Sequence, residues 1–298
     1  MMIEAANIRK KFQAETVIED VSLSVRKGSV YGLLGSNGAG KTTLLRMLAG
    51  ILKANRGSVH IDGQPVFENN AVKERVIFLQ DDLYFFSQYT PKQMAAFYKE
   101  TYASWDEERY TSLKQMLGLD ENKKINKLSK GMKRQVAFWL ALSSKPDVMI
   151  LDEPFDGLDA VVRKTIKSMM LQDVAEREMT VIISSHNLKE VEDICDYIGI
   201  LHKGTILLER DIDDLKEEFH KVQVAFRKGK EPVTDSLSLV HKEKRGSVYI
   251  YILRGNKEEI EDHFLSQEPV VFDQLTLTLE EIFIYEMRRV GYAEEDII

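Results

Sequence analysis

The sequence predicts an α/β protein that carries a helical insertion and a second, smaller α+β domain. Short apolar runs, at residues 148–154 and 180–185, are each followed by a helical stretch, which is typical of a buried parallel sheet. Residues 90–142 have a helical pattern throughout, and the texture changes again after about residue 215. These three observations indicate an α/β core, an insertion within it and an appended domain.

The domain boundaries follow from these changes. The chain has 298 residues, which is long for one compact domain and short for two large ones. We place a main domain at residues 1–215, with the helical insertion at about 88–145, and an accessory α+β domain at 216–298.

The first elements of the main domain read as strands that lead into a loop. Residues 2–8 and 17–25 alternate like strands, and residues 30–34 (VYGLL) form a short apolar run. A glycine-rich loop follows, and residues 42–52 then read as a helix. Further strands are expected at residues 58–66 (strand and turn) and 75–80.

The insertion shows clear helix boundaries. Thr90 is an N-cap followed by proline at the first helical position, and Asp106 begins a second helix that Gly118 ends. Ser129 caps a third helix. Its first turn contains Gly131, although glycine inside a helix costs about 1 kcal/mol relative to alanine.

The accessory domain alternates strands, helices and charged turns. The pattern predicts strands at 221–226, 247–253 and 270–277. It predicts helices at 256–265 and 278–290, and charged turns at 228–232 and 242–246.

Composition excludes several classes of protein. Net charge is −7, which argues against general nucleic-acid binding. The single cysteine, Cys195, cannot form a disulfide within the chain and fits a reducing cytoplasm. The N-terminus has no apolar signal-peptide region, and no segment reaches the roughly 18 uncharged apolar residues of a membrane span. If the protein works at a membrane, a partner must supply the spans.

Residues 35–42, GSNGAGKT, match the phosphate-loop pattern G-x-x-x-x-G-K-[ST] completely. Glycines allow backbone N–H groups to surround a phosphate chain, and the following helix directs its positive end at the same place. Lys41 would reach the β and γ phosphates, and Thr42 would coordinate Mg²⁺. The alternative is a chance match in a glycine-rich turn, but a strand precedes this loop and a helix follows it. The nucleotide-binding set is Gly35, Ser36, Asn37, Gly38, Ala39, Gly40, Lys41, Thr42 and Thr43.

Two adjacent carboxylates end the strand VMILDEP. Asp152 is expected to hold Mg²⁺, directly or through water. Glu153 points elsewhere and would polarise the attacking water as a general base. The alternative is that the pair only caps the next helix.

Together these stretches resemble the ATP-binding subunit of an ABC (ATP-binding cassette) transporter. The matching segments are GSNGAGKTT, Gln80 at the end of RVIFLQ, LSKGMKRQ, VMILDEP, FDGLD and SSH at 184–186. They occur in the family's order and cover residues 1 to about 215. The resemblance implies a P-loop NTPase (RecA-like) core with an N-terminal antiparallel β subdomain and the helical insertion, an ATPase with ATP and Mg²⁺ as cofactors.

The resemblance also implies roles for residues that look ordinary alone. Gln80 would contact Mg²⁺ and the attacking water, although alone it reads as a polar strand end. His186 would hydrogen-bond the γ-phosphate, although a lone histidine there is more often a cap or surface residue. Phe12 would stack on adenine with Val17 beside it, although a single aromatic ring in a turn more often packs in a core.

The signature segment of the family commonly reads LSGGQ. In this chain Lys130 replaces a glycine and Met132 the glutamine, and Phe155-Asp156 departs from the usual residues before Gly157-Leu158-Asp159. Two cassettes would stack head to tail, so that the signature residues of one close over the ATP of the other, and Asp159 would link the two sites. The expected signature set is Ser129, Lys130, Gly131 and Met132.

The resemblance implies a peripheral protein at the cytoplasmic face of the membrane. Its partners would be a transmembrane permease subunit and a second cassette, identical or different, with no nucleic acid. Residues 81–89, DDLYFFSQY, would dock the permease, or Phe85 and Phe86 are core. The closing segment resembles the tail of bacterial drug-exporter ATPases, which favours an exporter of antibiotics, peptides or cell-envelope compounds. The alternatives are a soluble non-transport or regulatory ABC ATPase and a P-loop kinase.

Overall fold

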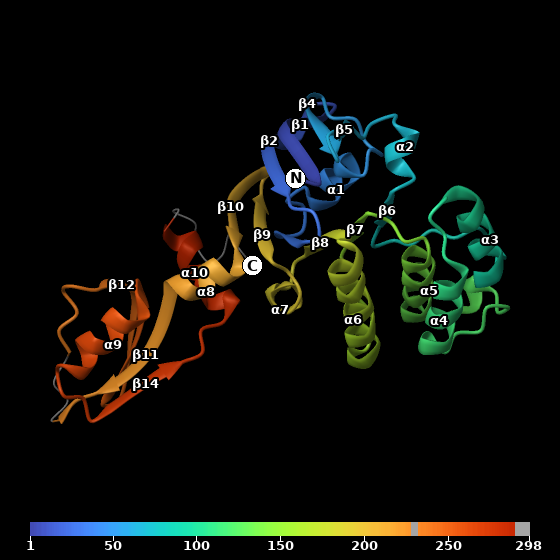
Figure 1. Ribbon diagram of the computed structural model, residues 1–298. Coiled ribbons are helices and arrows are strands. Elements are labelled where there is room, and N and C mark those ends of the chain that lie inside the picture. Colours follow the sequence, from blue (N-terminus) through green and yellow to red (C-terminus); the bar gives the residue numbers. More distant parts are fainter. Residues whose placement is uncertain (228–231, 290–298) are drawn as a thin grey trace. The chain divides into compact units, whose positions relative to one another are not determined.

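The structure, a computed structural model, describes residues 1–227 and 232–289 (Figure 1). It contains two compact units, one from Met1 to Glu209 and one from Arg210 onward. The sequence placed the domain boundary at 215/216, which lies within helix α8 (Ile212–Glu218). Because α8 belongs to the second unit as a whole, that unit begins a few residues before the position expected from sequence.

A ten-stranded sheet spans the first unit in the order β5-β4-β1-β2-β10-β9-β3-β8-β7-β6. At one end, β1 pairs antiparallel with β2 and β4, which confirms the predicted antiparallel subdomain. At the other end, β9, β3, β8, β7 and β6 are parallel, and β3, β7 and β8 are buried along their whole length. The strands are β1 (Ile3–Phe12), β2 (Glu15–Val25), β3 (Val30–Leu34), β4 (Arg56–Ile61), β5 (Gln64–Pro65), β6 (Val76–Leu79), β7 (Val148–Asp152), β8 (Thr180–Ser185), β9 (Tyr197–His202) and β10 (Thr205–Asp211).

The predicted helical insertion is present between β6 and β7 (Figure 1, green). Thr90 and Gln93 form a capping box, Asp106 caps the second helix, and Gly118 ends that helix in the left-handed conformation, as expected. The helices of the first unit are α1 (Lys41–Leu48), α2 (Asn70–Lys73), α3 (Pro91–Thr101), α4 (Glu107–Leu117), the 3₁₀ helix η1 (Ile125–Lys127), α5 (Lys130–Ser143), α6 (Ala160–Arg177) and α7 (Leu188–Glu192).

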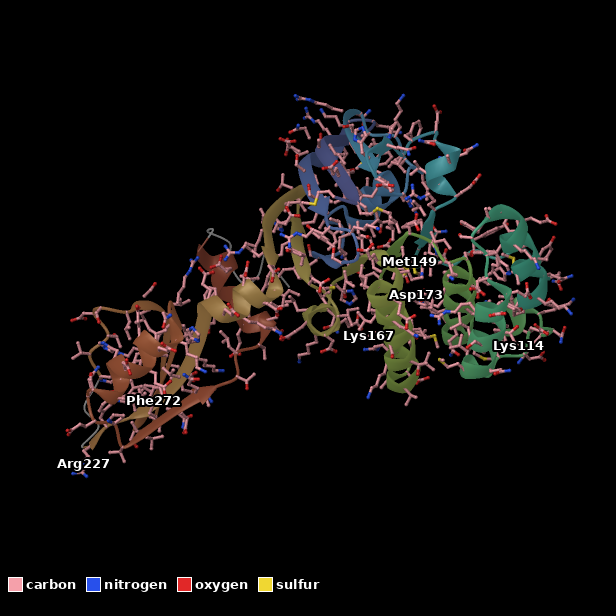
Figure 2. All side chains as sticks on the ribbon, in the orientation of Figure 1. Lys114, Met149, Lys167, Asp173, Arg227 and Phe272 are labelled. Atoms are coloured by element: carbon pink, nitrogen blue, oxygen red, sulfur yellow. The ribbon has the colours of Figure 1, made fainter. Side chains whose placement is uncertain are left out.

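Ring stacking joins two helices of the insertion to each other, and an ion pair attaches the insertion to the core. The indole of Trp139 on α5 is buried and stacks on Tyr110 of α4, with 4.5 Å between ring centroids. Asp173 on α6, labelled in Figure 2, lies 2.9 Å from Arg109 of α4 and 3.2 Å from Arg177. The carboxylate of Asp173 is buried, so these two arginines supply the charge that it needs there. The contacts fix α4 against the core.

The second unit contains a four-stranded antiparallel sheet in the order β12-β13-β11-β14. Buried Val222, Tyr251 and Phe264 and partly buried Phe272 (Figure 2) form its core between the sheet and helix α9. The elements are α8, β11 (Phe219–Ala225), β12 (Ser238–Arg245), β13 (Val248–Arg254), α9 (Lys257–Leu265), β14 (Val271–Leu275) and α10 (Leu279–Arg289).

One prediction for the second unit was wrong. Residues 242–246 were expected to be a charged turn, but Lys242 to Arg245 belong to β12, and the turn is formed by Gly246 and Ser247. The ammonium groups of Lys242 and Lys244 lie over the ring of Tyr249 on β13, at 5.6 and 4.9 Å from its centroid. These contacts let a charged segment pair as a strand. The other predicted turn, 228–232, lies outside the described residues except for Pro232, as does Val290 at the end of the last helix.

Within residues 1–227 and 232–289, no helix combines the length and apolar character that crossing a membrane requires.

Candidate phosphate-binding site

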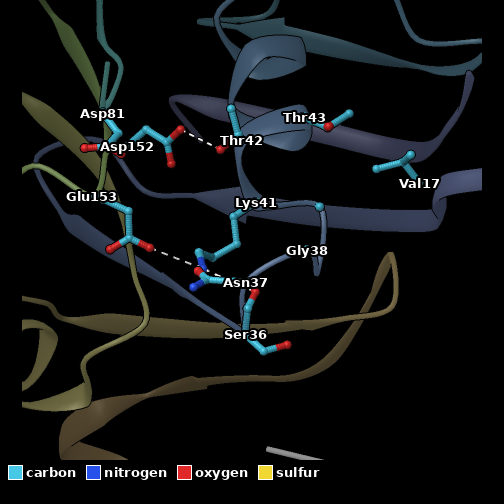
Figure 3. Close-up of a pocket in the computed structure, with 11 residues that line it drawn as sticks. Val17, Ser36, Asn37, Gly38, Lys41, Thr42, Thr43, Asp81, Asp152 and Glu153 are labelled. Carbon is cyan, nitrogen blue, oxygen red and sulfur yellow. Dashed lines mark hydrogen bonds and ion pairs between the residues drawn. The ribbon is translucent and has the colours of Figure 1, made fainter. Parts of the chain in front are cut away.

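The predicted strand, glycine-rich loop and helix are present at residues 30–48. Strand β3 is buried, the loop follows it, and α1 begins at Lys41 with Gly40 at its N-cap in the left-handed region, φ 104°. A cavity of about 340 Å³ opens above this loop (Figure 3). It is lined by Val17, Ser36, Asn37, Gly38, Gly40, Lys41, Thr42, Thr43, Asp81, Asp152 and Glu153.

Gly35 is required by close packing at the start of the loop. A Cβ at this position would lie 2.3 Å from the backbone carbonyl oxygen of Leu201 on β9. Because a backbone atom cannot move aside like the end of a flexible side chain, only glycine fits. This close approach places the start of the loop against the parallel sheet.

Asp152 is positioned by two hydroxyl groups. Thr42 Oγ1 donates a hydrogen bond of 2.6 Å to Asp152 Oδ2, and Ser184 Oγ donates one of 2.6 Å to Oδ1. The carboxylate is buried at the end of β7. The adjacent oxygens of Thr42 and Asp152 (Figure 3) are the kind of hard ligands that Mg²⁺ prefers. No group of three or more His, Cys, Asp or Glu that could hold a metal occurs among the described residues, and Mg²⁺ usually takes only one or two protein carboxylates beside phosphate oxygens.

Glu153 lies at the centre of the predicted catalytic residues. Its Oε1 is 3.2 Å from Lys41 Nζ, and its Oε2 is 3.0 Å from His186 Nδ1. Lys41 also donates to the carbonyl of Gly35 at 2.7 Å. Only 7% of the Lys41 side chain and 13% of the Glu153 side chain are exposed, so a phosphate that binds Lys41 competes with this carboxylate. Figure 3 shows Glu153 directed at Lys41.

Other predicted residues lie in a neighbouring cavity. Phe12, Thr43 and Gln80 line a space of about 640 Å³ that is separate from the cavity at Lys41. Thr43 borders both cavities. Phe12 is 45% exposed, with the ammonium of Lys10 at 5.1 Å from the centroid of its ring. The structure thus brings Val17 to the phosphate loop but leaves Phe12 and Gln80 apart from Lys41.

The signature residues form the start of α5. Ser129 Oγ accepts a hydrogen bond from the N–H of Met132 at 3.2 Å, which confirms the predicted N-cap. A Cβ on Gly131 would lie 3.0 Å from the carbonyl of Gly157. The glycine therefore allows the helix to approach the loop after β7 of its own chain.

The remaining predicted residues also lie away from Lys41. Ser129, Lys130 and Asp159 are exposed, and the Asp159 carboxylate caps α6 by accepting from two backbone N–H groups at 3.0 Å. Among the described residues, those that line the phosphate cavity do not include any of the four signature residues or Asp159. Ser129, Lys130 and Asp159 are therefore exposed outside this cavity.

Sequence reasoning missed three residues that the structure places at the site. Asp81 lines the cavity. Ser184 Oγ donates to Asp152 and accepts from the N–H of Glu153, and Arg134 donates to the carbonyl of Glu153 and to Asp81. The available signals were weak. Asp81 directly follows Gln80, and Ser184 is paired with Asp152 only through parallel register. Arg134 directly follows Lys133 at the start of α5, so its sequence position does not distinguish it from a solvent-exposed cation.

Comparisons with known proteins agree with this geometry. Residues 18–156 match the family model described as "ABC transporter". The chain is 34% identical over 283 residues to the ABC transporter ATP-binding protein YtrB of Bacillus subtilis (strain 168), covering 95% of this chain and 97% of that protein. It is 32% identical to the bacitracin transport ATP-binding protein BcrA of Bacillus licheniformis, over 74% of this chain and 73% of that protein. A solved ATP-binding subunit of an ABC transporter superposes with a TM-score of 0.68 at 26% identity, covering 72% of this chain and 92% of that one.

Proposed function

The chain belongs to the family of ABC transporter ATP-binding proteins and is an ATPase, and we propose that it dimerises on ATP and powers transport through a separate membrane-spanning subunit. The observation that carries this proposal is the contact of Glu153 with both Lys41 and His186. A base, a phosphate-binding cation and a histidine are thereby assembled in one chain, as hydrolysis of a bound nucleotide requires.

We infer a role for each group in hydrolysis. Lys41 and the loop N–H groups bind the β and γ phosphates, and Glu153 accepts a proton from the attacking water. His186 holds the γ-phosphate and orients Glu153 through its Nδ1. Thr42 and Asp152 would hold Mg²⁺, together with Gln80. Bound Mg²⁺ neutralises the charge that develops on the phosphates.

ATP binding favours a dimer because the signature residues complete the site of a second copy. The four residues from Ser129 to Met132 are at the N-terminal end of α5, where the helix dipole favours an anion. They would contact the γ-phosphate on the partner, with Asp159 at the junction and with Phe12 and Val17 against the adenine. ADP lacks this phosphate, so hydrolysis removes the differential affinity that holds the dimer closed.

An exposed aromatic cluster is the proposed docking surface for the permease. Phe86 lies 5.1 Å from Tyr89 and 5.2 Å from Phe97, measured between ring centroids, and 6.4 Å from Tyr84. Tyr84 is 78% exposed and Phe86 is 39% exposed, so Phe86 is not core, whereas Phe85 is half-buried. Such a patch suits a protein partner. It would hold the subunit at the cytoplasmic face of the membrane.

The transported compound is proposed from the relatives. BcrA is named for bacitracin transport and is 32% identical to this chain. We therefore propose an exporter of antibiotics, peptides or cell-envelope compounds. The second unit would then be a dimerisation or regulatory element.

The test combines turnover with assembly. Glu153→Gln should leave ATP binding intact and lower the rate of ATP hydrolysis at least about tenfold, because it removes the base and keeps the phosphate loop. Lys41→Ala should instead weaken nucleotide binding. Co-purification should recover a membrane-spanning subunit with the wild-type chain, and less of it with Tyr84→Glu at equal ATP affinity. Unchanged turnover in Glu153→Gln would refute the base, and recovery without a membrane subunit would favour a non-transport ATPase.

A further inference from the structure

Arg134 is a buried cation one turn into the helix that begins with the signature residues. Only 2% of the residue is exposed. Its guanidinium donates through Nη1 to the backbone carbonyl of Glu153, and through Nη2 to both the carbonyl and Oδ1 of Asp81, each at 2.8 Å. Asp81 directly follows Gln80, and Glu153 directly follows Asp152, so Arg134 contacts the neighbours of two functional residues.

These contacts join three segments that are distant in sequence. Arg134 belongs to α5 of the helical insertion, Asp81 to the loop after β6, and Glu153 to the loop after β7. Asp81 and Glu153 both line the phosphate cavity. A displacement of α5 relative to the core would therefore be transmitted directly to the backbone of Glu153.

The backbone of Glu153 needs such support. Its φ is 46°, in the left-handed region that residues with a Cβ disfavour. Its N–H donates to Ser184 Oγ at 3.1 Å, and its carbonyl accepts from Arg134. Both polar groups of this strained residue are thus held from outside its own strand. In this conformation the carboxylate reaches Lys41 and His186.

The chemistry of this position favours arginine over other residues. The planar guanidinium presents several N–H donors in a fixed fork, so it can bridge two loops, whereas lysine offers one small ammonium group. The Nε of Arg134 is buried and has no hydrogen-bond partner in the described chain. The Nε of Arg177 is also buried without a partner, so it is the bridge from α5 to both Asp81 and Glu153 that points to a role of Arg134 in the site.

We propose that Arg134 is a positioning residue that holds Glu153 in its reactive orientation and makes that orientation depend on the placement of the signature helix. The inference rests on the proposed role of Glu153 as the general base. Arg134 acts through the Glu153 carbonyl and through the Asp81 loop, and it does not touch the nucleotide.

The experiment compares buried Arg134 with Arg177, whose side chain is 20% exposed, in the purified full chain. Arg177 is the control, because it also donates to two backbone carbonyls, of Lys145 and Pro146, and to one carboxylate, Asp173, but lies away from the cavity. Arg134→Met should lower kcat for ATP hydrolysis by about 10- to 100-fold, the usual effect of removing a support of a functional group, and change the Kd of ATP by less than about threefold. Arg177→Met should keep kcat within about threefold of the wild-type value, even if the substitution lowers the Tm.

A double-mutant cycle separates positioning from a general structural role. In a Glu153→Gln background, Arg134→Met should change the residual turnover by less than about threefold, because the group that it positions is already gone. If Arg134→Met does not fold, Arg134→Lys replaces it in the same comparison, with a loss of about tenfold expected.

The outcomes distinguish this inference from the proposed function. A kcat within threefold of wild type in Arg134→Met overturns the inference. So does a loss in the double variant, relative to Glu153→Gln, that equals the loss in Arg134→Met alone. In both cases Glu153 remains the base. Full turnover in Glu153→Gln alone overturns the proposed role of Glu153 as the base, and the inference falls with it.

Discussion

Ser184→Ala should destabilise the first unit far more than the loss of one hydroxyl usually does. The Ser184 hydroxyl donates to Asp152 Oδ1 at 2.6 Å and accepts from the N–H of Glu153 at 3.1 Å. Ser184 is fully buried, and so is nearly all of Asp152. The substitution leaves a buried charged acceptor with one fewer donor and a buried N–H without its partner.

The expected magnitude follows from these two bonds. A hydrogen bond to a charged group contributes about 1.5–3 kcal/mol, and a neutral one contributes about 1 kcal/mol. Their joint loss should lower the free energy of unfolding by about 3 kcal/mol. The strained φ of Glu153 also loses one of its two backbone supports, so turnover should fall as well.

Ser143→Ala is the matched control. Ser143 is as buried as Ser184, but its hydroxyl donates only to the carbonyl of Trp139 within the same helix. Urea unfolding monitored by tryptophan fluorescence measures both variants in the first unit, because Trp105 and Trp139 both lie there. If Ser184→Ala and Ser143→Ala differ by less than about 0.5 kcal/mol, the reasoning about the acidic pair is refuted.

Two further predictions concern the phosphate loop and the insertion. Gly35→Ala should weaken ATP binding at least about tenfold, since its Cβ would meet the Leu201 carbonyl. Gly63→Ala strains the backbone at φ 72° but has open space around its Cβ, so it should leave the Kd unchanged; equal affinities would contradict the packing argument. The backbone N–H of Arg109, together with the Lys145 ammonium at 3.2 Å, lowers the pKa of Asp106 in the folded protein. The Asp106 carboxylate therefore contributes its full stabilisation above the ordinary carboxyl pKa near 3.9. This stabilisation is lost as the pH falls through the lower pKa of the folded state. Asn still caps a helix, so Asp106→Asn should lower the free energy of unfolding by only about 0.2–1 kcal/mol at pH 7. Urea titrations should show this difference from wild type shrinking below about pH 4. A difference that is constant with pH would exclude the charge effect.

Local chemistry explains why much of the insertion could be predicted. Thr90, Asp106 and Ser129 each cap the helix expected of them, because a cap needs only a side-chain oxygen and the N–H groups two or three residues later. The turn predicted at 242–246 was wrong for the opposite reason. Whether charged residues pair as a strand depends on the partner across the sheet, here Tyr249, which sequence spacing does not reveal.

The same distinction applies to the candidate site. The phosphate loop, Asp152 and Glu153 follow from sequence, because each motif is a short run whose geometry is set by a strand and a helix that adjoin it. Asp81, Ser184 and Arg134 come from separate segments, and their contacts depend on how the sheet register and α5 bring these segments together. No rule of residue spacing along the sequence predicts such contacts.

By itself, the sequence determined an α/β nucleotide-binding chain with a helical insertion, since apolar periodicity, caps and the glycine-rich loop act over a few residues. Only the tertiary structure decided that Glu153 stands between Lys41 and His186, that Ser184 and Arg134 hold its backbone, and that Gly131 packs on Gly157. The physical reason is that burial and parallel register, which act between distant segments, determine which polar groups share one small space.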